Sequence, residues 1–131
     1  MTDGTVMRIA LGQFFVKESS AENLEIVRGL IDRAEAGGAE LLVLPEGIVA
    51  RKPGVSDWGV RHAEPLSGPF VTGLLEATKG RRVTVVCTVQ AKLPNEARYA
   101  NDLLVARDGR LEGAATNKCM ISIKSHALLT P

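Results

Sequence analysis

The chain has 131 residues, which is long enough for one domain with its own hydrophobic core. Hydrophobic residues make up 45% of it and charged residues 24%, the usual composition of a soluble globular protein. The net charge of +1 and the aromatic content of 4% give no reason to expect a nucleic acid or an anionic membrane as partner.

The chain begins with a predicted strand and a predicted helix. Residues 1–6 read as a lead-in without regular structure, and Met7 to Phe15 form an apolar run that predicts a buried strand. Ser19 and Glu22 have the spacing of a capping box, and Gly37-Gly38 is a helix-ending pair. Between these signals, apolar residues recur at helical intervals: Leu24, Val27, Ile31 and Ala34.

A second strand follows at once, and its end is the most informative part of the sequence. Leu41 to Leu44 form an apolar run, and short joints on both sides of the helix favour parallel pairing with the first strand. Pro45 ends the run, and Glu46 comes next. The carboxyl ends of parallel strands are where open α/β folds place their ligands, so Glu46 is a candidate general base. The alternative is that Pro45 and Glu46 only begin a polar loop.

The middle of the chain predicts a long loop and a second helix. Ile48 to Pro69 is rich in Gly and Pro and reads as irregular, with Trp58 packing the loop onto the body. A long loop after a strand end often shapes a site. Phe70 to Lys79 predicts a helix that stops at Gly80.

The last predicted elements are a strand and a hairpin. Val83 to Val89 is strongly β-branched and predicts a buried strand. Asn101 to Arg107 and Arg110 to Ala115 flank Asp108-Gly109, the pair that two-residue hairpin turns favour. The whole order predicts an α/β fold with a mixed sheet.

The ordered motifs give the chain a resemblance to the amino-terminal half of the carbon–nitrogen hydrolase family, the nitrilase superfamily. The matching stretches are RIALGQF (8–14), ENLEIVRGLIDRAEAGGAELLVLPEG (22–47), LSGPF (66–70), VTVVCTV (83–89) and YANDLLVARDGRL (99–111). The resemblance implies part of an α-β-β-α sandwich, with helices on one face of the sheet. Within the family, the chain resembles the omega-amidase and deaminated-glutathione-amidase branch.

The resemblance also implies a Glu–Lys–Cys triad without a metal or an organic cofactor. In the family, a cysteine thiolate attacks the carbonyl or nitrile carbon. The glutamate takes and returns protons, and the lysine stabilises the tetrahedral intermediate. Glu46 matches the family glutamate directly.

The lysine does not match directly. In the family it lies in a segment of the type Arg-Tyr-x-Lys-x-His-Leu, where this chain reads AATNKCMISIK from Ala114. Counted from Gly109, the family position falls on Asn117, one residue before Lys118. A slip of one residue turns a side chain to the opposite face, so Lys118 serves only if a bulge or the loop absorbs that residue. Otherwise Lys118 is a solvated surface lysine, and Lys124 is the second candidate.

The family cysteine has no clear match. It follows the lysine by a few tens of residues in the family, and this chain reaches only Pro131. Cys87 lies within an apolar strand, where a cysteine is typically an inert small hydrophobe. Cys119 lies next to Lys118, whose charge favours a thiolate, but neighbours on a strand point apart.

The resemblance fades towards the end of the chain. We expect a partial hydrolase domain at 7–113 and a divergent tail at 114–131, from truncation or a shifted reading frame. A nitrilase-like continuation in the downstream bases would test this hypothesis. No apolar stretch of membrane-spanning length, no secretory signal and only two cysteines lead us to expect a cytoplasmic protein.

Other polar residues have open interpretations. Arg51 and Lys52 line a pocket for an acidic substrate or are solvated surface charges. Asn101 matches a family asparagine and is interpreted as structural. The isolated His62 and His126 do not indicate a metal site.

Three functions compete at this point. The first is an amidase that hydrolyses small linear amides, with a homodimer as the implied assembly. The second is a catalytically inactive fragment with the family fold, whose apolar sheet face favours association. The third is an unrelated α/β binding domain, which leaves the ordered motifs unexplained.

Overall fold

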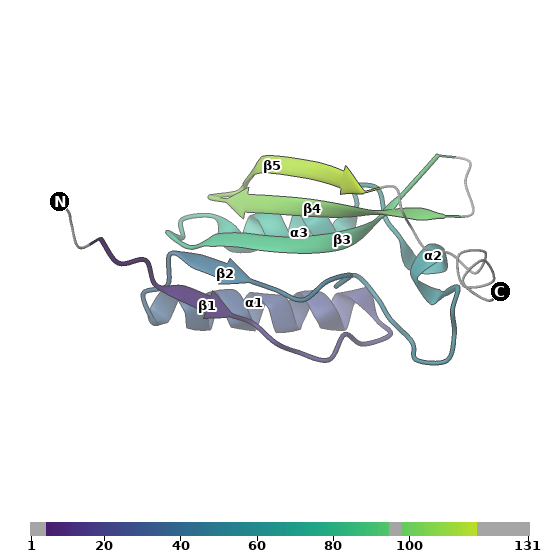
Figure 1. Ribbon diagram of the computed structural model, residues 1–131, viewed down its shortest axis with the longest axis horizontal. Helices are drawn as coiled ribbons and strands as arrows, with labels where there is room; N and C mark the ends of the chain where they lie inside the picture. Colours follow the sequence, from purple (N-terminus) through teal and green to yellow (C-terminus); the bar gives the residue numbers. More distant parts are fainter. Residues whose placement is uncertain (1–4, 95–97, 118–131) are drawn as a thin grey trace.

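The computed structural model describes residues 5–94 and 98–117, and its strands form one five-stranded mixed sheet backed by two helices (Figure 1). The elements are β1 (Ile9–Leu11), α1 (Ser20–Ala36), β2 (Leu41–Val43), α2 (Trp58–His62), α3 (Pro69–Thr78), β3 (Thr84–Lys92), β4 (Tyr99–Arg107) and β5 (Arg110–Asn117). The fold class predicted from the sequence, α/β with a mixed sheet and helices on one face, is confirmed. No helix within the described ranges is long and apolar enough to span a bilayer.

The strands follow one another across the sheet in sequence order. β1, β2 and β3 are parallel, and β3, β4 and β5 are antiparallel. The predicted βαβ unit and the predicted hairpin are therefore both confirmed. The carboxyl ends of β2 and β3 lie together, because parallel strands point the same way.

Helix α1 begins and ends where the local sequence signals predicted. Ser19 is its N-cap, and the Ser19 Oγ accepts a hydrogen bond of 3.3 Å from Glu22 N. Gly38 follows the helix with φ +75°, a conformation that glycine adopts without strain. The predicted stripe is buried at Val27 and Ile31, so this face of α1 packs on the sheet.

The hydrophobic core lies between the sheet and the helices α1 and α3, which lie behind the sheet in Figure 1. Alternate residues of the strands enter this core, because side chains along a strand point to opposite faces. The largest of its fully buried apolar side chains are Phe70, Ile31, Leu42, Ile48, Leu74 and Leu104.

The opposite face of the sheet is apolar and exposed. Ile9, Leu11 and Leu103 expose 51%, 72% and 41% of their surface. Leu11 pairs with Val43, and residues directly opposite each other share a face. No helix of the described residues lies over this face in Figure 1.

The prediction of a buried strand over Met7–Phe15 was wrong in length and burial. The strand covers only Ile9–Leu11 and forms an edge of the sheet. Its outward side chains lie on the uncovered face. An apolar run reports which side chains can be buried and does not report what lies over them.

The hairpin turn joins the sheet to the end of α3. Asp108 and Gly109 have φ values of 46° and 78°, as a turn with two left-handed residues requires. Gly109 N donates to Thr78 Oγ1 at 2.8 Å, and Gly80 N donates to Asp108 Oδ1 at 2.9 Å. The turn residues therefore fix both the hairpin and its contact with the helix.

The segment predicted as irregular contains a short helix. α2 (Trp58–His62) lies within the range Ile48–Pro69, so that part of the prediction was wrong. Trp58 Nε1 donates to Glu18 O at 3.1 Å, which attaches the segment to the loop before α1. The predicted packing role of Trp58 is confirmed.

Candidate active site

Glu46 lies directly after β2, on a backbone that β3 holds in place. Leu44 N donates to Val86 O at 3.0 Å, and Gly47 N donates to Thr88 Oγ1 at 2.9 Å. Gly47 has φ +62°, and a Cβ there would lie 3.2 Å from Gln90 Nε2. The chain therefore turns sharply after Glu46, in a space that suits glycine. The Glu46 side chain itself is exposed.

The loop after Glu46 is fixed by a buried glutamine on β3. Gln90 is 6% exposed. Its Oε1 accepts a hydrogen bond from Val49 N at 2.9 Å, and its Nε2 donates to Ala50 O at 3.0 Å. This satisfies two backbone groups of a loop that is not part of the sheet.

A buried asparagine of α1 fixes the same loop from the other side. Asn23 is 0% exposed, and its Nδ2 donates to Val49 O and to Lys17 O, both at 2.9 Å. Lys17 N donates to Asn23 Oδ1 at 2.7 Å. Asn23 and Gln90 together form the loop clamp, the name we use below for these two side chains. The clamp therefore hydrogen-bonds the backbone of the loop that follows Glu46 from two sides.

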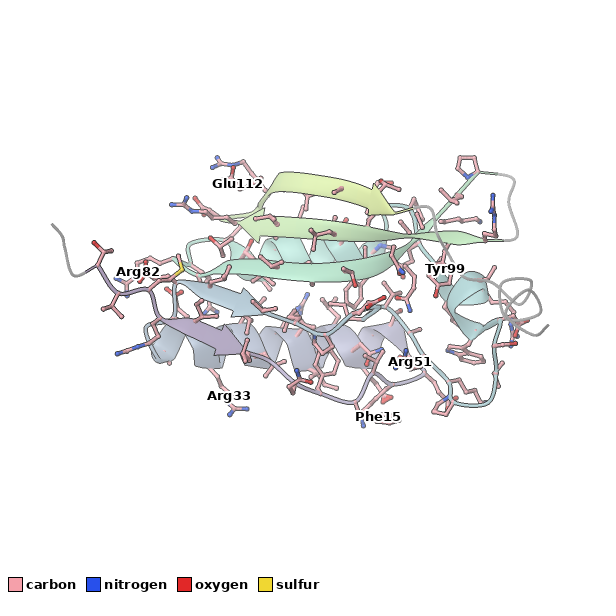
Figure 2. The ribbon with its side chains drawn as sticks, in the orientation of Figure 1. Phe15, Arg33, Arg51, Arg82, Tyr99 and Glu112 are labelled. Carbon is pink, nitrogen blue, oxygen red and sulfur yellow. The ribbon has the colours of Figure 1, made fainter. Side chains whose placement is uncertain are left out.

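Glu46 lines an open cleft of about 710 Å³ at this end of the sheet. Its walls come from β3, β4, the loop before α1 and the segment around α2. Phe15, Arg51 and Tyr99 are among the lining residues, and Figure 2 shows them in the same part of the molecule, far from Arg33. The cleft combines aromatic walls with a carboxylate, as small-molecule sites commonly do.

Two charged side chains of the cleft, Arg51 and Glu46, act on the phenol of Tyr99. Tyr99 is half-buried, and burial raises the pKa of its hydroxyl. The positive charge of Arg51 lowers that pKa, and the negative charge of Glu46 raises it. Tyr99 therefore lies within electrostatic reach of both groups.

The chain is similar in sequence to a known amidase. It is 33% identical over 100 residues to a deaminated glutathione amidase of Escherichia coli O157:H7. The matched region covers 76% of this chain and 37% of the amidase. It matches the structure of XC1258 from Xanthomonas campestris, a CN-hydrolase superfamily protein, with a TM-score of 0.69 and 26% identity over 85% of this chain and 40% of that chain. The chain belongs to the carbon–nitrogen hydrolase superfamily. It spans little more than a third of the length of the amidase.

A solved structure shows the same fold at lower identity. Nit3 of Saccharomyces cerevisiae, a member of branch 10 of the nitrilase superfamily, matches with a TM-score of 0.68 and 20% identity, over 85% of this chain and 44% of that chain. No family model matches the chain. The resemblance inferred from the ordered motifs is confirmed.

The cysteine that the structure describes is unsuited to nucleophilic attack. Cys87 is 2% exposed within β3, and burial raises the pKa of its thiol to about 12. A thiol with that pKa is protonated at neutral pH. Cys119 lies outside the described residues, as do the candidate lysines Lys118 and Lys124 and the isolated His126.

The register of β5 bears on the lysine position that the family resemblance implies. Val105 pairs with Gly113 while Ala106 pairs with Leu111, so Glu112 is an extra residue in a β-bulge. After the bulge, Asn117 pairs with Asn101, which lines the cleft. β5 thus contains a one-residue bulge of the kind that Lys118 requires, and Asn117 pairs with Asn101 in this register, while Lys118 itself lies outside the described residues.

The remaining predicted residues lie around the cleft. Arg51 and Lys52 both line it, and Asn101, interpreted as structural, lines it as well. His62 stacks on Trp58 with ring centroids 4.1 Å apart, and its Nδ1 lies 2.9 Å from Trp58 O. Within the ranges 5–94 and 98–117, no three His, Cys, Asp or Glu side chains gather in a metal-like group.

Sequence reasoning missed both residues of the loop clamp. A signal exists for Asn23, because it lies four residues before Val27 and so falls on the buried stripe of α1. A polar residue on such a stripe must have buried partners. Gln90 gave a weaker signal, as a polar residue directly after a β-branched run.

Proposed function

We propose that the chain carries the glutamate side of an amidase site and acts on the C–N bond of small linear amides. The observation that carries the proposal is Glu46, which lines the cleft at the carboxyl end of β2 on a backbone held by the loop clamp. The similarity to a deaminated glutathione amidase supports the amide as substrate class.

The reaction would follow the chemistry of the superfamily. A cysteine thiolate attacks the amide carbon, and the carbonyl electrons move to the oxygen, where a cation stabilises the oxyanion. Glu46 accepts the thiol proton and gives it to the leaving nitrogen, so the C–N bond breaks and a thioester remains. Water, deprotonated by Glu46, then releases the acid. No metal or organic cofactor takes part in this scheme.

The chain offers two candidates for the cation of this scheme and one for its nucleophile. Lys118 is the candidate cation, and Lys124 is the second candidate. Cys119 is the remaining cysteine, since burial keeps the Cys87 thiol protonated.

A specific observation favours the alternative, an inactive member of the superfamily. Counted from Gly109, the family lysine position falls on an asparagine, Asn117, which pairs with Asn101 across β4 and β5. A chain with Glu46 but without a cation and a nucleophile in the cleft would bind amides without hydrolysing them.

The two functions differ in a single assay. The purified chain is incubated with a panel of small amides, and ammonia release is measured. The amidase function predicts release that is lost in Glu46→Gln and kept in Glu40→Gln, a matched change at an exposed carboxylate before β2. Release that persists in Glu46→Gln would refute the role of Glu46, and no release by the parent chain supports the inactive member.

A further inference from the structure

We propose that Asn101 binds the amide group of the substrate directly, through its side-chain carboxamide, and so makes the cleft prefer amides to other carbonyl compounds. The proposal rests on the proposed function, because it names a recognition group in the same cleft. Asn101 and Glu46 both line that cleft, so one small molecule can reach both side chains. This role goes beyond the structural one that the sequence alone indicated for Asn101.

The pleat of β4 directs Asn101 away from the hydrophobic core. Its neighbours along the strand, Ala100 and Asp102, are 1% and 6% exposed. Side chains along a strand alternate between faces, so Tyr99 and Asn101 share the other face, where both are half-buried and line the cleft. Two residues along a strand lie about 6.6 Å apart. Because Tyr99 lies within electrostatic reach of Glu46, Asn101 belongs to the same wall of the cleft.

The residue that faces Asn101 on β3 has the same functional group, but the fold already uses it. Gln90 pairs with Asn101 and also lines the cleft. Its Oε1 and Nε2 are hydrogen-bonded to the backbone of Val49 and Ala50. Within the part of the chain that the structure describes, the Asn101 side chain forms no hydrogen bond. One carboxamide therefore holds the loop, and the other is available to a ligand.

A carboxamide side chain is chemically complementary to the amide group of a substrate. It carries an NH₂ donor and a carbonyl acceptor side by side. Asn101 Nδ2 donates to the carbonyl oxygen of the bound amide, and Asn101 Oδ1 accepts from its N–H. An ester or a ketone offers the acceptor without the N–H and leaves Oδ1 unpaired. A site that hydrogen-bonds a substrate group disfavours analogues that lack the group.

The aromatic wall of the cleft suits the alkyl chain of such an amide. Phe15 lines the cleft with 71% of its surface exposed. A Cβ at Gly59 would lie 3.0 Å from Tyr99 Cε1, so α2 packs closely on the Tyr99 ring. Apolar walls with a few placed polar groups are typical of small-molecule sites. An uncharged linear amide is therefore a suitable probe of Asn101.

Binding of two probes of the same shape tests the inference without any need for turnover. Hexanamide carries an NH₂ group where 2-heptanone carries a methyl group. Both are titrated into the full chain and followed by the backbone amide signals of the cleft in NMR spectra. Asn101→Leu keeps the side-chain volume and removes both hydrogen-bonding groups. We expect it to reduce the affinity for hexanamide, relative to that for 2-heptanone, by about tenfold, the scale of one lost hydrogen bond.

A second variant and a control separate hydrogen bonding from a change of structure. Asn101→Asp keeps the shape and the acceptor but removes the donor, so it should weaken the binding of both probes by about tenfold. Thr84→Val removes a half-buried hydroxyl from β3, at a residue that does not line the cleft. It should leave both affinities within about twofold. Circular dichroism shows whether each variant keeps the fold.

The outcomes distinguish this inference from the proposed function. An unchanged ratio of affinities in Asn101→Leu would overturn the inference, as would failure of the parent chain to bind hexanamide. If Asn101→Leu does not fold, unchanged affinities in Asn101→Asp would overturn it instead. Ammonia release that depends on Glu46, with a ratio that does not depend on Asn101, would leave the amidase function standing. A ratio that depends on Asn101 without ammonia release would refute the amidase function alone.

Discussion

Gln90 and Val49 are 41 residues apart in sequence, and a hydrogen bond of 2.9 Å joins the Gln90 side chain to the Val49 backbone. With the second bond of Gln90, to Ala50 O at 3.0 Å, this contact holds the loop that follows Glu46. The cleft therefore depends on a buried side chain that also lines it.

The first prediction concerns the stability that Gln90 provides. Gln90→Met keeps the side-chain volume and leaves Val49 N and Ala50 O buried without partners. We expect a loss of about 2–4 kcal/mol in the free energy of unfolding, because each buried unsatisfied group costs about 1–3 kcal/mol. Urea denaturation of the variant and the parent chain measures this loss. Gln13→Met, at an exposed glutamine, should cost less than about 0.5 kcal/mol. Equal urea midpoints of unfolding for Gln90→Met and Gln13→Met would show that the clamp does not stabilise the fold.

Local sequence patterns predicted most of the helices, strands and turns of this fold, but they did not predict the contacts of the loop clamp. The capping box at Ser19, the β-branched run of β3 and the Asp108–Gly109 turn each contain their own signal within a few residues. The contacts of Asn23 and Gln90 with Val49 join residues 26 and 41 positions apart, so no local pattern records them. The same reason explains the error at β1, where exposure depends on what lies over the sheet.

The second prediction is a pH dependence that comes from Glu35. Its carboxylate accepts hydrogen bonds from Arg82 N at 3.1 Å and Val83 N at 3.0 Å, which joins the end of α1 to the start of β3. The hydrogen bond from Arg82 lowers the pKa of the Glu35 carboxyl below its ordinary value, burial opposes this, and the bond from Val83 acts in the same direction as that from Arg82. A lowered folded-state pKa gives stability that is present above the unfolded-state pKa and is lost as pH falls through the folded-state pKa.

Glu35→Gln should therefore cost most at neutral pH and little in acid. We expect about 1 kcal/mol at neutral pH, since the carboxylate is partly exposed and solvent weakens the bonds. Urea denaturation across the acid range measures the difference from the parent chain. Glu40→Gln is the control, and a constant difference at all pH values would contradict the prediction.

The third prediction concerns the reactivity of Cys87. Burial raises the pKa of its thiol to about 12, so the native protein holds it protonated at neutral and mildly alkaline pH. In a Cys119→Ser background, we expect no reaction of the native chain with a thiol reagent and full reaction in urea. The raised folded-state pKa also means that stability falls as pH rises above the unfolded-state value towards 12. Rapid labelling of the native chain would contradict the buried assignment.

The fourth prediction concerns the exposed face of the sheet. Leu11 and Leu103 lie on it with 72% and 41% of their surface exposed, and contiguous apolar surface of this kind binds hydrophobic dyes. We expect the native chain to bind such a dye and to elute as larger than a monomer at high concentration. Leu103→Lys should reduce both effects without loss of helical signal in circular dichroism. Arg107→Glu, at an exposed residue of the same strand, should leave dye binding unchanged.

The last prediction separates two positions for the cation of the amidase site. If Glu46 and Lys118 act together, Lys118→Met lowers ammonia release by about 100-fold, the usual effect of losing one donor to an oxyanion. Lys79→Met, at a lysine that pairs with Glu76 on α3, should change the rate by less than about twofold. The register allows the opposite outcome, because Asn117 is the residue that pairs with Asn101. An unchanged rate in Lys118→Met together with a gain in Asn117→Lys would assign the cation position to residue 117, and the present chain would then lack its positive charge there.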